Sequence, residues 1–205
     1  MSTRQPSLFE ADVTGAPPSG HSVGRTDLGH GAWVELRRHW ITRADGLFER
    51  LHRSLPWRAE RRAMYGKLVD VPRLVCFFEE GSELPDPFLP RAMAALSERY
   101  GGRDPFRTVG CCLYRAGGDS VAWHGDRIGR GATHDTVVAI VSLGGPRRFL
   151  LRPRAGGSSV RYTLRDGDLL VMGGSCQRTW EHAVPKTVLT VAPRISVQFR
   201  PAGVR

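Results

Sequence analysis

The sequence predicts an α+β fold: a jelly roll of two facing β-sheets, with N-terminal helices packed on one sheet. Short β-rich segments follow one another from about residue 107 onward, glycine-rich turns separate them, and two segments with helical spacing precede them. Several short strands joined by regular turns are typical of sandwiches and barrels. The 205 residues fit one domain, since single domains commonly contain about 100–200 residues.

The N-terminal region divides into a leader and a helical part. Residues 1–26 are rich in Pro, Gly, Ser and Thr and show little periodicity, so we expect a flexible leader there. Ordered structure should begin near Ala32. Residues 44–55 place three leucines four positions apart, which is helical spacing, and Pro56 ends this first helix.

A second helix is expected to begin at Asp86, which can cap it, with Pro87 in its first position. The apolar side chains at positions 89, 93, 96 and 100 share one face, and two glycines then close the helix. We therefore expect residues 27–205 to form a single domain, with the helices in about 27–105 and the jelly-roll core in about 106–200.

Six β-rich segments are expected to build that core. The turn sequences AGGD, GGPR, AGGSS and RDGD lie between them. The expected strands cover residues 109–114, 136–143, 147–151, 160–164, 168–172 and 187–199.

Composition narrows the class of protein. The net charge of +10 favours a polyanionic partner, although nearly all basic residues are arginines, a bias that a genome can also produce. No segment approaches the roughly 20 apolar residues of a membrane helix, and the N-terminus lacks the apolar part of a secretory signal. We expect a cytoplasmic, monomeric protein without membrane attachment. The four cysteines form no CxxC pair, which argues against a zinc knuckle or a disulfide framework.

The strongest motif is the sequence WHGD at positions 123–126. In an extended segment, residues i and i+2 point to the same side, so His124 and Asp126 can bind one metal ion together. His182, 58 residues later, is the expected third ligand, and His134 is a weaker alternative. Two histidines and one carboxylate occupy one face of an octahedral ion and leave positions for a co-substrate and oxygen.

The last predicted strand alternates between two kinds of residue. Ile195, Val197 and Phe199 should face an apolar core, whereas Arg194, Ser196, Gln198 and Arg200 should share the other face. An arginine that points into a barrel is costly unless an anion meets it, and a dicarboxylate suits two guanidinium groups. On a straight strand the Cα atoms of the two arginines would lie roughly 20 Å apart, so both contact one small ligand only if the strand bends or their side chains converge.

These motifs together resemble the AlkB family of iron(II)/2-oxoglutarate dioxygenases. The resemblance covers roughly residues 30–200 and depends on the ligand spacing, on Arg194 twelve residues after His182, and on Arg200 six further. It includes the segments LYRAGGDSVAWHGD (113–126), GDLLVMGGSCQRTWEHAVPK (167–186) and PRISVQFR (193–200). The segment VDVPRL (69–74) is similar to the start of the family's nucleotide-recognition lid.

The resemblance implies roles for particular residues. His124, Asp126 and His182 would hold Fe(II) as the catalytic centre. Tyr114 would hydrogen-bond 2-oxoglutarate, Arg194 would bind its distal carboxylate, and Arg200 would lie near its iron-bound end. Ser196 would replace an asparagine of some members as a hydrogen-bond donor.

The implied reaction is oxidative demethylation of N-alkylated bases such as 1-methyladenine and 3-methylcytosine in DNA or RNA. It uses Fe(II), O2 and 2-oxoglutarate and releases succinate, CO2 and formaldehyde, which amounts to repair of alkylation damage. The expected partner is alkylated nucleic acid, single- or double-stranded. A methylated Watson–Crick edge pairs badly, which lowers the cost of flipping the base.

Substrate contacts are expected along the basic segment 49–65 and around the metal. Arginines there can follow phosphates while Trp57 and Tyr65 stack on bases, although both aromatics could equally cover the core. The predicted substrate residues are Tyr65, Phe78, Arg127 and Arg178.

Besides Ser196, two positions depart from the family pattern. Cys112 stands where an asparagine often contacts 2-oxoglutarate, and Ile128 stands where an acidic residue often reads the base. An oxygenase of a small molecule and a non-enzymatic nucleic-acid binder therefore remain as alternatives. A protein that only binds nucleic acid, however, would need neither the three metal ligands nor Arg194 and Arg200.

Overall fold

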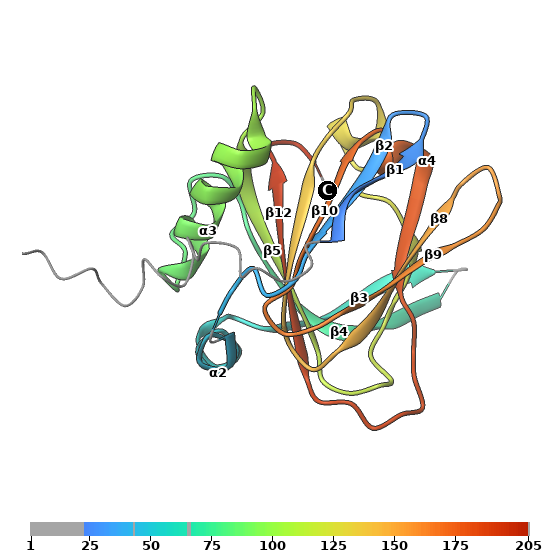
Figure 1. The fold of residues 1–205 in the computed structure, drawn as a ribbon. Helices are drawn as coiled ribbons and strands as arrows, with labels where there is room; N and C mark the ends of the chain where they lie inside the picture. The colour runs from blue at the N-terminus through green and yellow to red at the C-terminus, as the bar shows by residue number, and fades with distance from the viewer. Residues whose placement is uncertain (1–22, 43, 65–66, 205) are drawn as a thin grey trace, which may run out of the picture.

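Two antiparallel sheets face each other in the computed structural model, which describes residues 23–42, 44–64 and 67–204 (Figure 1). The larger sheet has the order β1-β2-β10-β7-β12-β5-β4-β3, and the smaller has the order β6-β11-β8-β9. The predicted jelly roll is thus confirmed. The strands of the larger sheet are β1 (Val23–Gly29), β2 (Ala32–Arg37), β10 (Leu169–Gly174), β7 (Val138–Gly144), β12 (Arg194–Pro201), β5 (Phe106–Tyr114), β4 (Lys67–Phe78) and β3 (Arg58–Met64); those of the smaller are β6 (Val121–His124), β11 (Trp180–Val184), β8 (Arg147–Pro153) and β9 (Val160–Leu164).

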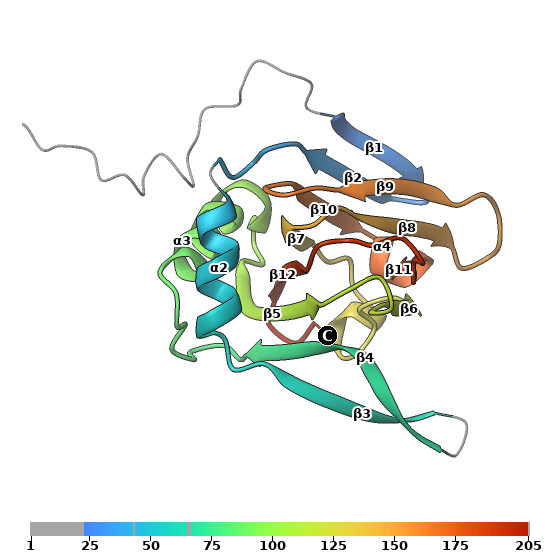
Figure 2. The ribbon, with the colours of Figure 1, turned by 90° about the horizontal axis from the view of Figure 1, so that it is seen from below.

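The two longer helices cover the outer face of the larger sheet. Helix α2 (Ala44–Ser54) packs against β7 and β12, and α3 (Phe88–Leu96) packs against β5 (Figure 2). Their apolar stripes meet the outward side chains of the strands in one core, where Leu51, Leu89 and Val197 are fully buried. In the part of the chain that the structure describes, no helix is long and apolar enough to cross a membrane.

A second apolar cluster lies between the two sheets. Leu151, Leu164 and Met172 are buried in it, together with the ring of Tyr114. The central strands therefore contribute to two interiors, and alternate residues of one strand enter different environments. The polar residues of β12 belong to the space between the sheets.

The N-terminal predictions need two changes. Strand β1 begins at Val23 and pairs with β2, so residues 23–26 are part of the sheet and not of a leader; residues 1–22 lie outside the described residues. Helix α3 begins at Phe88, whose backbone N–H donates to the Asp86 carboxylate at 2.9 Å, and a π-helical turn (Ser97–Gly101) follows it.

The C-terminal prediction of one strand over residues 187–199 was too long. Only β12 forms, because residues 187–193 have no strand to pair with and connect β11 to β12 as a loop. Val188 and Leu189 are exposed in that loop. β-branched residues favour a strand only where a partner and a buried face exist.

The basic segment 49–65 also divides into two parts. Its first part belongs to α2, and Trp57 packs against the helix-side core while its indole N–H donates to the backbone oxygen of His52. Its second part is β3, which forms with β4 a long hairpin that extends past the edge of the barrel (Figure 2). Of the two aromatics, Trp57 therefore covers the core, and Tyr65 lies outside the described residues.

Candidate metal centre and co-substrate pocket

The three predicted ligands meet between the two sheets. His124 ends β6 and is the direct partner of His182 on β11, with ring centroids 4.2 Å apart. One ligand atom from each of His124, Asp126 and His182 lies within 4.8 Å of the others. Among the described residues, this is the one group of three His, Cys, Asp or Glu side chains close enough to share an ion.

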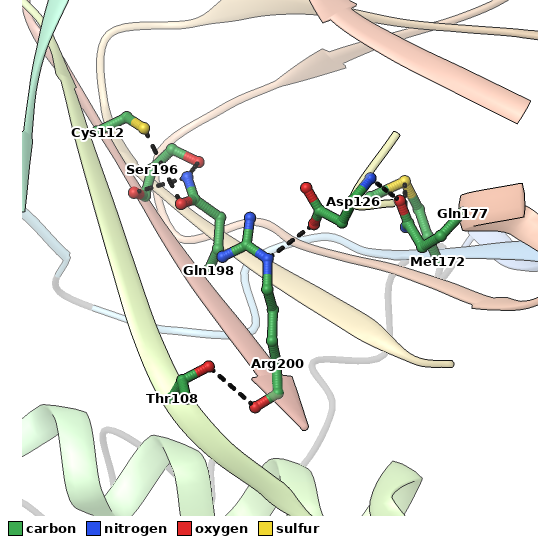
Figure 3. A network of polar contacts seen from close by, with 8 residues as sticks. All are labelled: Thr108, Cys112, Asp126, Met172, Gln177, Ser196, Gln198 and Arg200. Atoms are coloured by element: carbon green, nitrogen blue, oxygen red, sulfur yellow. Dashed lines mark hydrogen bonds and ion pairs between the residues drawn. The ribbon is translucent and has the colours of Figure 1, made fainter. Parts of the chain in front are cut away.

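Hydrogen bonds from outside the group orient these ligands. The Nδ1 of His124 lies 2.8 Å from the backbone oxygen of Ala122 and donates to it, so Nε2 is left for a metal. Arg200 donates from Nε to the Asp126 carboxylate at 2.7 Å, and the Asp126 backbone N–H donates to the Gln177 side chain at 2.9 Å (Figure 3). Such outer contacts fix the direction in which each ligand atom points.

The glycine of the WHGD motif has a steric role. A Cβ at Gly125 would lie 2.7 Å from the backbone oxygen of Gln177, closer than real contacts allow. Gln177 approaches this closely because it also accepts the Asp126 hydrogen bond. The residue between the two ligands must therefore be glycine for the loop to pack.

Electrostatics keep the three ligands in their metal-binding protonation states. Burial, together with neighbouring His124, lowers the pKa of His182 to about 3, and burial also lowers the pKa of His124. Burial alone would raise the pKa of Asp126, but Arg200 and His182 outweigh it and hold the pKa below its usual range. Both imidazoles are thus neutral and the carboxylate is ionised near neutral pH, as metal binding requires.

A buried guanidinium lies further along the same face of β12. Arg194 is 1% exposed and donates from Nε to the Ser142 hydroxyl at 2.8 Å, whereas its Nη1 is buried and has no hydrogen-bond partner. Its strand partner Tyr114 carries a phenol whose pKa burial raises to about 12, so the phenol keeps its proton and can donate. An anion is the ligand that these donors lack.

A second arginine stabilises the wall of this pocket. The guanidinium of Arg147 lies 5.4 Å from the Tyr114 ring centroid and donates to the backbone oxygens of Ala116, Asp119 and Pro185. It therefore joins the loops at this end of the barrel and keeps Tyr114 in place.

The other predicted co-substrate residues have partners within the protein. Gln198 donates to the Ser196 hydroxyl at 2.7 Å, and its side-chain oxygen lies 3.9 Å from the Cys112 sulfur (Figure 3). Arg200 is paired with Asp126. Arg194 and Arg200 thus donate from their Nε groups to different partners, Ser142 and Asp126.

Of the predicted substrate residues, Tyr65 lies outside the described residues, and the other three have different surroundings. Arg127 is exposed beside the metal ligands, and Arg178 forms an ion pair with Asp135. Phe78 packs against the helix-side core, on the wrong face of β4 for a substrate contact. Its neighbour Phe77, 37% exposed, faces Gly110 and the side chain of Arg200 instead.

Sequence reasoning missed several residues of the site. Ser142 gave a usable signal, because it is polar within the otherwise apolar strand segment AIVSL. Gln177 and Arg147 gave none, since each acts through a contact with residues far away in the sequence.

The residues present fit an iron(II) ion and 2-oxoglutarate. Two neutral imidazoles and one carboxylate match the ligand set of non-haem iron oxygenases. The unpaired Nη1 of Arg194 on the same face of β12 offers a guanidinium to a carboxylate.

Comparison with known proteins agrees with this site. Residues 41–200 match the sequence profile of the 2OG-Fe(II) oxygenase superfamily. The proteins named alpha-ketoglutarate-dependent dioxygenase alkB homolog 3 are 31% identical over 186 residues in Bos taurus and 29% identical over 181 residues in Homo sapiens. Each alignment covers 78% of this chain and 62% of the relative, so the chain spans less than two thirds of their length.

Two further matches span more of the compared proteins. The DNA oxidative demethylase ALKBH2 of Arabidopsis thaliana is 26% identical over 246 residues, with 96% of this chain and 76% of the relative covered. The solved structure of OsALKBH1 superposes with a TM-score of 0.61 at 16% identity, covering 85% of this chain and 100% of that one, which supports the fold. The chain therefore belongs to the 2OG-Fe(II) oxygenase superfamily and, within it, to the AlkB family.

Proposed function

We propose that this protein is an Fe(II)- and 2-oxoglutarate-dependent dioxygenase that removes alkyl groups from N-alkylated nucleobases. The observation that carries the proposal is the combination of a complete ligand triad with a buried guanidinium whose Nη1 is unpaired on the same strand face. A structural metal site would need no open donor for an anion. The names of the relatives supply the substrate class.

In the proposed reaction, both oxygen atoms of O2 are accounted for. Oxidative decarboxylation converts 2-oxoglutarate to succinate and CO2, and succinate keeps one oxygen atom. The other oxygen atom enters a C–H bond of the N-methyl group, and the resulting hemiaminal releases formaldehyde and the restored base. Bound iron supplies the oxygen activation.

The protein's own residues bind, orient and shield. His124, Asp126 and His182 hold the ion, while Arg200 and Gln177 keep Asp126 aligned. Arg194 and the protonated Tyr114 hold the co-substrate deep in the barrel, away from water. Holding the reacting atoms in place is the main contribution that a protein makes to cofactor chemistry.

Two features support nucleic acid as the partner: the net charge of the chain and the position of the β3–β4 hairpin. The chain carries a net charge of +10, and the β3–β4 hairpin continues from the strand that borders the site. Arg58 and Arg61 are exposed on this hairpin. Basic side chains beside an active centre attract a phosphate backbone.

The test is a demethylation assay with matched controls. Purified protein is incubated with Fe(II), ascorbate, 2-oxoglutarate and oligonucleotides that carry 1-methyladenine or 3-methylcytosine, and mass spectrometry follows both the oligonucleotide and succinate. We expect the mass of one CH2 group to be lost per lesion, and no loss with His124→Ala. Succinate without a change in the oligonucleotide would point to a small-molecule substrate. Neither product from iron-loaded protein would contradict the enzyme and favour a nucleic-acid binder.

Two expectations from the sequence stay predictions. Cell fractionation would test the cytoplasmic location, and light scattering of the purified protein would test the monomer.

A further inference from the structure

Two cysteines face each other across neighbouring strands of the larger sheet. Cys76 on β4 and Cys111 on β5 are direct partners in the strand register, in the middle of an unbroken run of pairs from Leu74 to Phe78. Directly opposite residues of antiparallel strands point to the same side of the sheet, with Cα atoms about 4.5 or 5.5 Å apart. A disulfide spans Cα distances of about 4.4–6.8 Å, so the two strands already hold these cysteines at a suitable separation.

The side chains of the pair are in contact. Both are free thiols in the helix-side core, with Cys76 8% exposed and Cys111 1% exposed. The two thiols are hydrogen-bonded to each other, and this contact together with burial raises the pKa of the Cys111 thiol. Cys111 therefore keeps its proton, and Cys76, which is less buried, is the sulfur that a small oxidant reaches first.

The other two cysteines are placed differently. Cys112 follows Cys111 on β5 and so points to the opposite side of the sheet, where its sulfur lies 3.9 Å from the side-chain oxygen of Gln198. Cys176 is buried in the second apolar cluster, between the sheets. Among the described residues, Cys76 and Cys111 are thus the pair of cysteines that share one face on adjacent strands.

A bond between these cysteines would join the β3–β4 hairpin to the barrel. In the larger sheet, β5 is the neighbour of β4 on the barrel side, and β3 is its neighbour on the other side (Figure 2). Within the sheet, the hairpin is therefore attached by the pairing of β4 with β5, and Cys76 lies at the centre of that pairing. A crosslink here closes a loop of about 35 residues, which removes conformational freedom mainly from the unfolded chain.

We propose that Cys76 and Cys111 form a reversible disulfide when the protein meets a peroxide, and that this disulfide fastens β4 to β5. Hydrogen peroxide oxidises the Cys76 thiol to a sulfenic acid as its O–O bond breaks and one water leaves. The Cys111 sulfur then displaces the hydroxyl group from Cys76, so that the S–S bond forms, the S–O bond breaks and a second water carries away the Cys111 proton. The two thiols lose two hydrogens, and the peroxide is reduced to two waters. The crosslink requires neither metal nor co-substrate, so it goes beyond the proposed function.

Thiol counting on the purified full chain tests the crosslink. Reduced protein is treated with hydrogen peroxide or equilibrated with oxidised glutathione, the remaining thiols are alkylated in denaturant, and the intact mass is measured. We expect two of the four thiols to escape alkylation, with the mass of two hydrogens lost, no covalent dimer on a non-reducing gel, and full recovery with dithiothreitol. Cys76→Ala and Cys111→Ala should each abolish the crosslink, whereas the matched controls Cys112→Ser and Cys176→Ser should keep it.

Thermal unfolding tests whether the crosslink fastens the two strands. The Tm of the oxidised wild type should lie about 5–15 °C above that of the reduced protein, because a closed loop of this length restricts the unfolded chain. Oxidised Cys111→Ala should show no such rise. Folded wild type that keeps four alkylatable thiols at equilibrium with oxidised glutathione would overturn the proposal. A disulfide that persists in Cys111→Ala, or a crosslink that lowers the Tm, would overturn it too.

Discussion

The two faces of β12 serve different purposes within one strand. Ile195, Val197 and Phe199 are fully buried against the helix-side core, where any well-packed apolar side chain would serve. Arg194 and Arg200, on the other face, each depend on one particular partner, Ser142 and Asp126. The strand thereby holds the site rigidly, because its apolar half is locked into the core.

The two faces of β12 differ in whether their side chains already have all their partners within the protein. The helix side is filled by apolar contacts, and it gains nothing from a ligand. The barrel side leaves Nη1 of Arg194 without a partner although it is buried. A buried donor without a partner destabilises the empty site and favours a ligand that completes it. Substitutions on the first face should therefore change stability, and those on the second should change binding.

The largest effect is expected for the metal ligands. His182→Ala removes one of three ligands, and we expect demethylation to be abolished and Mn(II) affinity to fall by more than about 100-fold, since even outer-shell changes cost about 10- to 100-fold. Calorimetry and the oligonucleotide assay measure this. Retained metal affinity in the variant would show that another group, such as His134, completes the site.

Phe199→Ala tests the apolar face. Removing this fully buried ring should lower the free energy of unfolding by about 3–5 kcal/mol, because the core cannot fill the cavity. Urea denaturation gives the value. At a temperature where the variant remains folded, its Kd for 2-oxoglutarate should match the wild type. A large loss of affinity in the folded protein would show that the two faces of β12 do not act independently.

Arg194→Met tests the polar face with a residue of similar length. We expect the Kd of 2-oxoglutarate to rise by about 10- to 100-fold, which corresponds to about 1.5–3 kcal/mol for a hydrogen bond to a charged group. Stability of the ligand-free protein should stay near that of the wild type or increase, since the variant no longer buries an incompletely paired charge. An unchanged Kd would show that Arg194 does not bind 2-oxoglutarate.

Alternation made much of this arrangement predictable from sequence. A period of two placed the arginines and the apolar residues of β12 on opposite faces, and the HxD spacing placed both first ligands on one side. Such patterns depend only on neighbouring residues, so they hold in any fold in which the segment forms a strand.

What the sequence left open depends on contacts between distant segments. Arg200 and Asp126 are 74 positions apart, and nothing local shows that the arginine supports a metal ligand. The adjacent pair Phe77 and Phe78 contains one ring for each face of β4, and only the strand register decides which. Residues 187–193 have strand propensity but no partner strand, which propensity cannot reveal.

The pH dependence of the metal-free protein gives a smaller effect. Because burial depresses the pKa values of His124 and His182 below 6.5, the unfolded state binds more protons than the native state at mildly acidic pH. Stability should therefore be complete above about pH 6.5 and fall as the pH is lowered, by about 1 kcal/mol or more between pH 6 and 5. Urea midpoints across this range measure the slope, and His182→Gln should reduce it. A slope that is the same in the variant would mean that other groups cause it.

The smallest effect on stability is expected at the β3–β4 hairpin, which is not part of β12 and belongs to neither of its faces. Arg61 and Asp70 form an ion pair at 3.0 Å in which both side chains are largely exposed, so Arg61→Ala should change the free energy of unfolding by less than about 0.5 kcal/mol. If the hairpin follows a phosphate backbone, the same change should reduce the salt dependence of oligonucleotide binding by about one unit of slope, with the Kd of 2-oxoglutarate unchanged. Arg107→Ala is the matched control, since Arg107 is similarly exposed and pairs with Glu80 on the body of the protein. Equal loss of slope in both variants would indicate a general effect of charge, whereas loss in Arg61→Ala alone would identify the hairpin as the nucleic-acid contact.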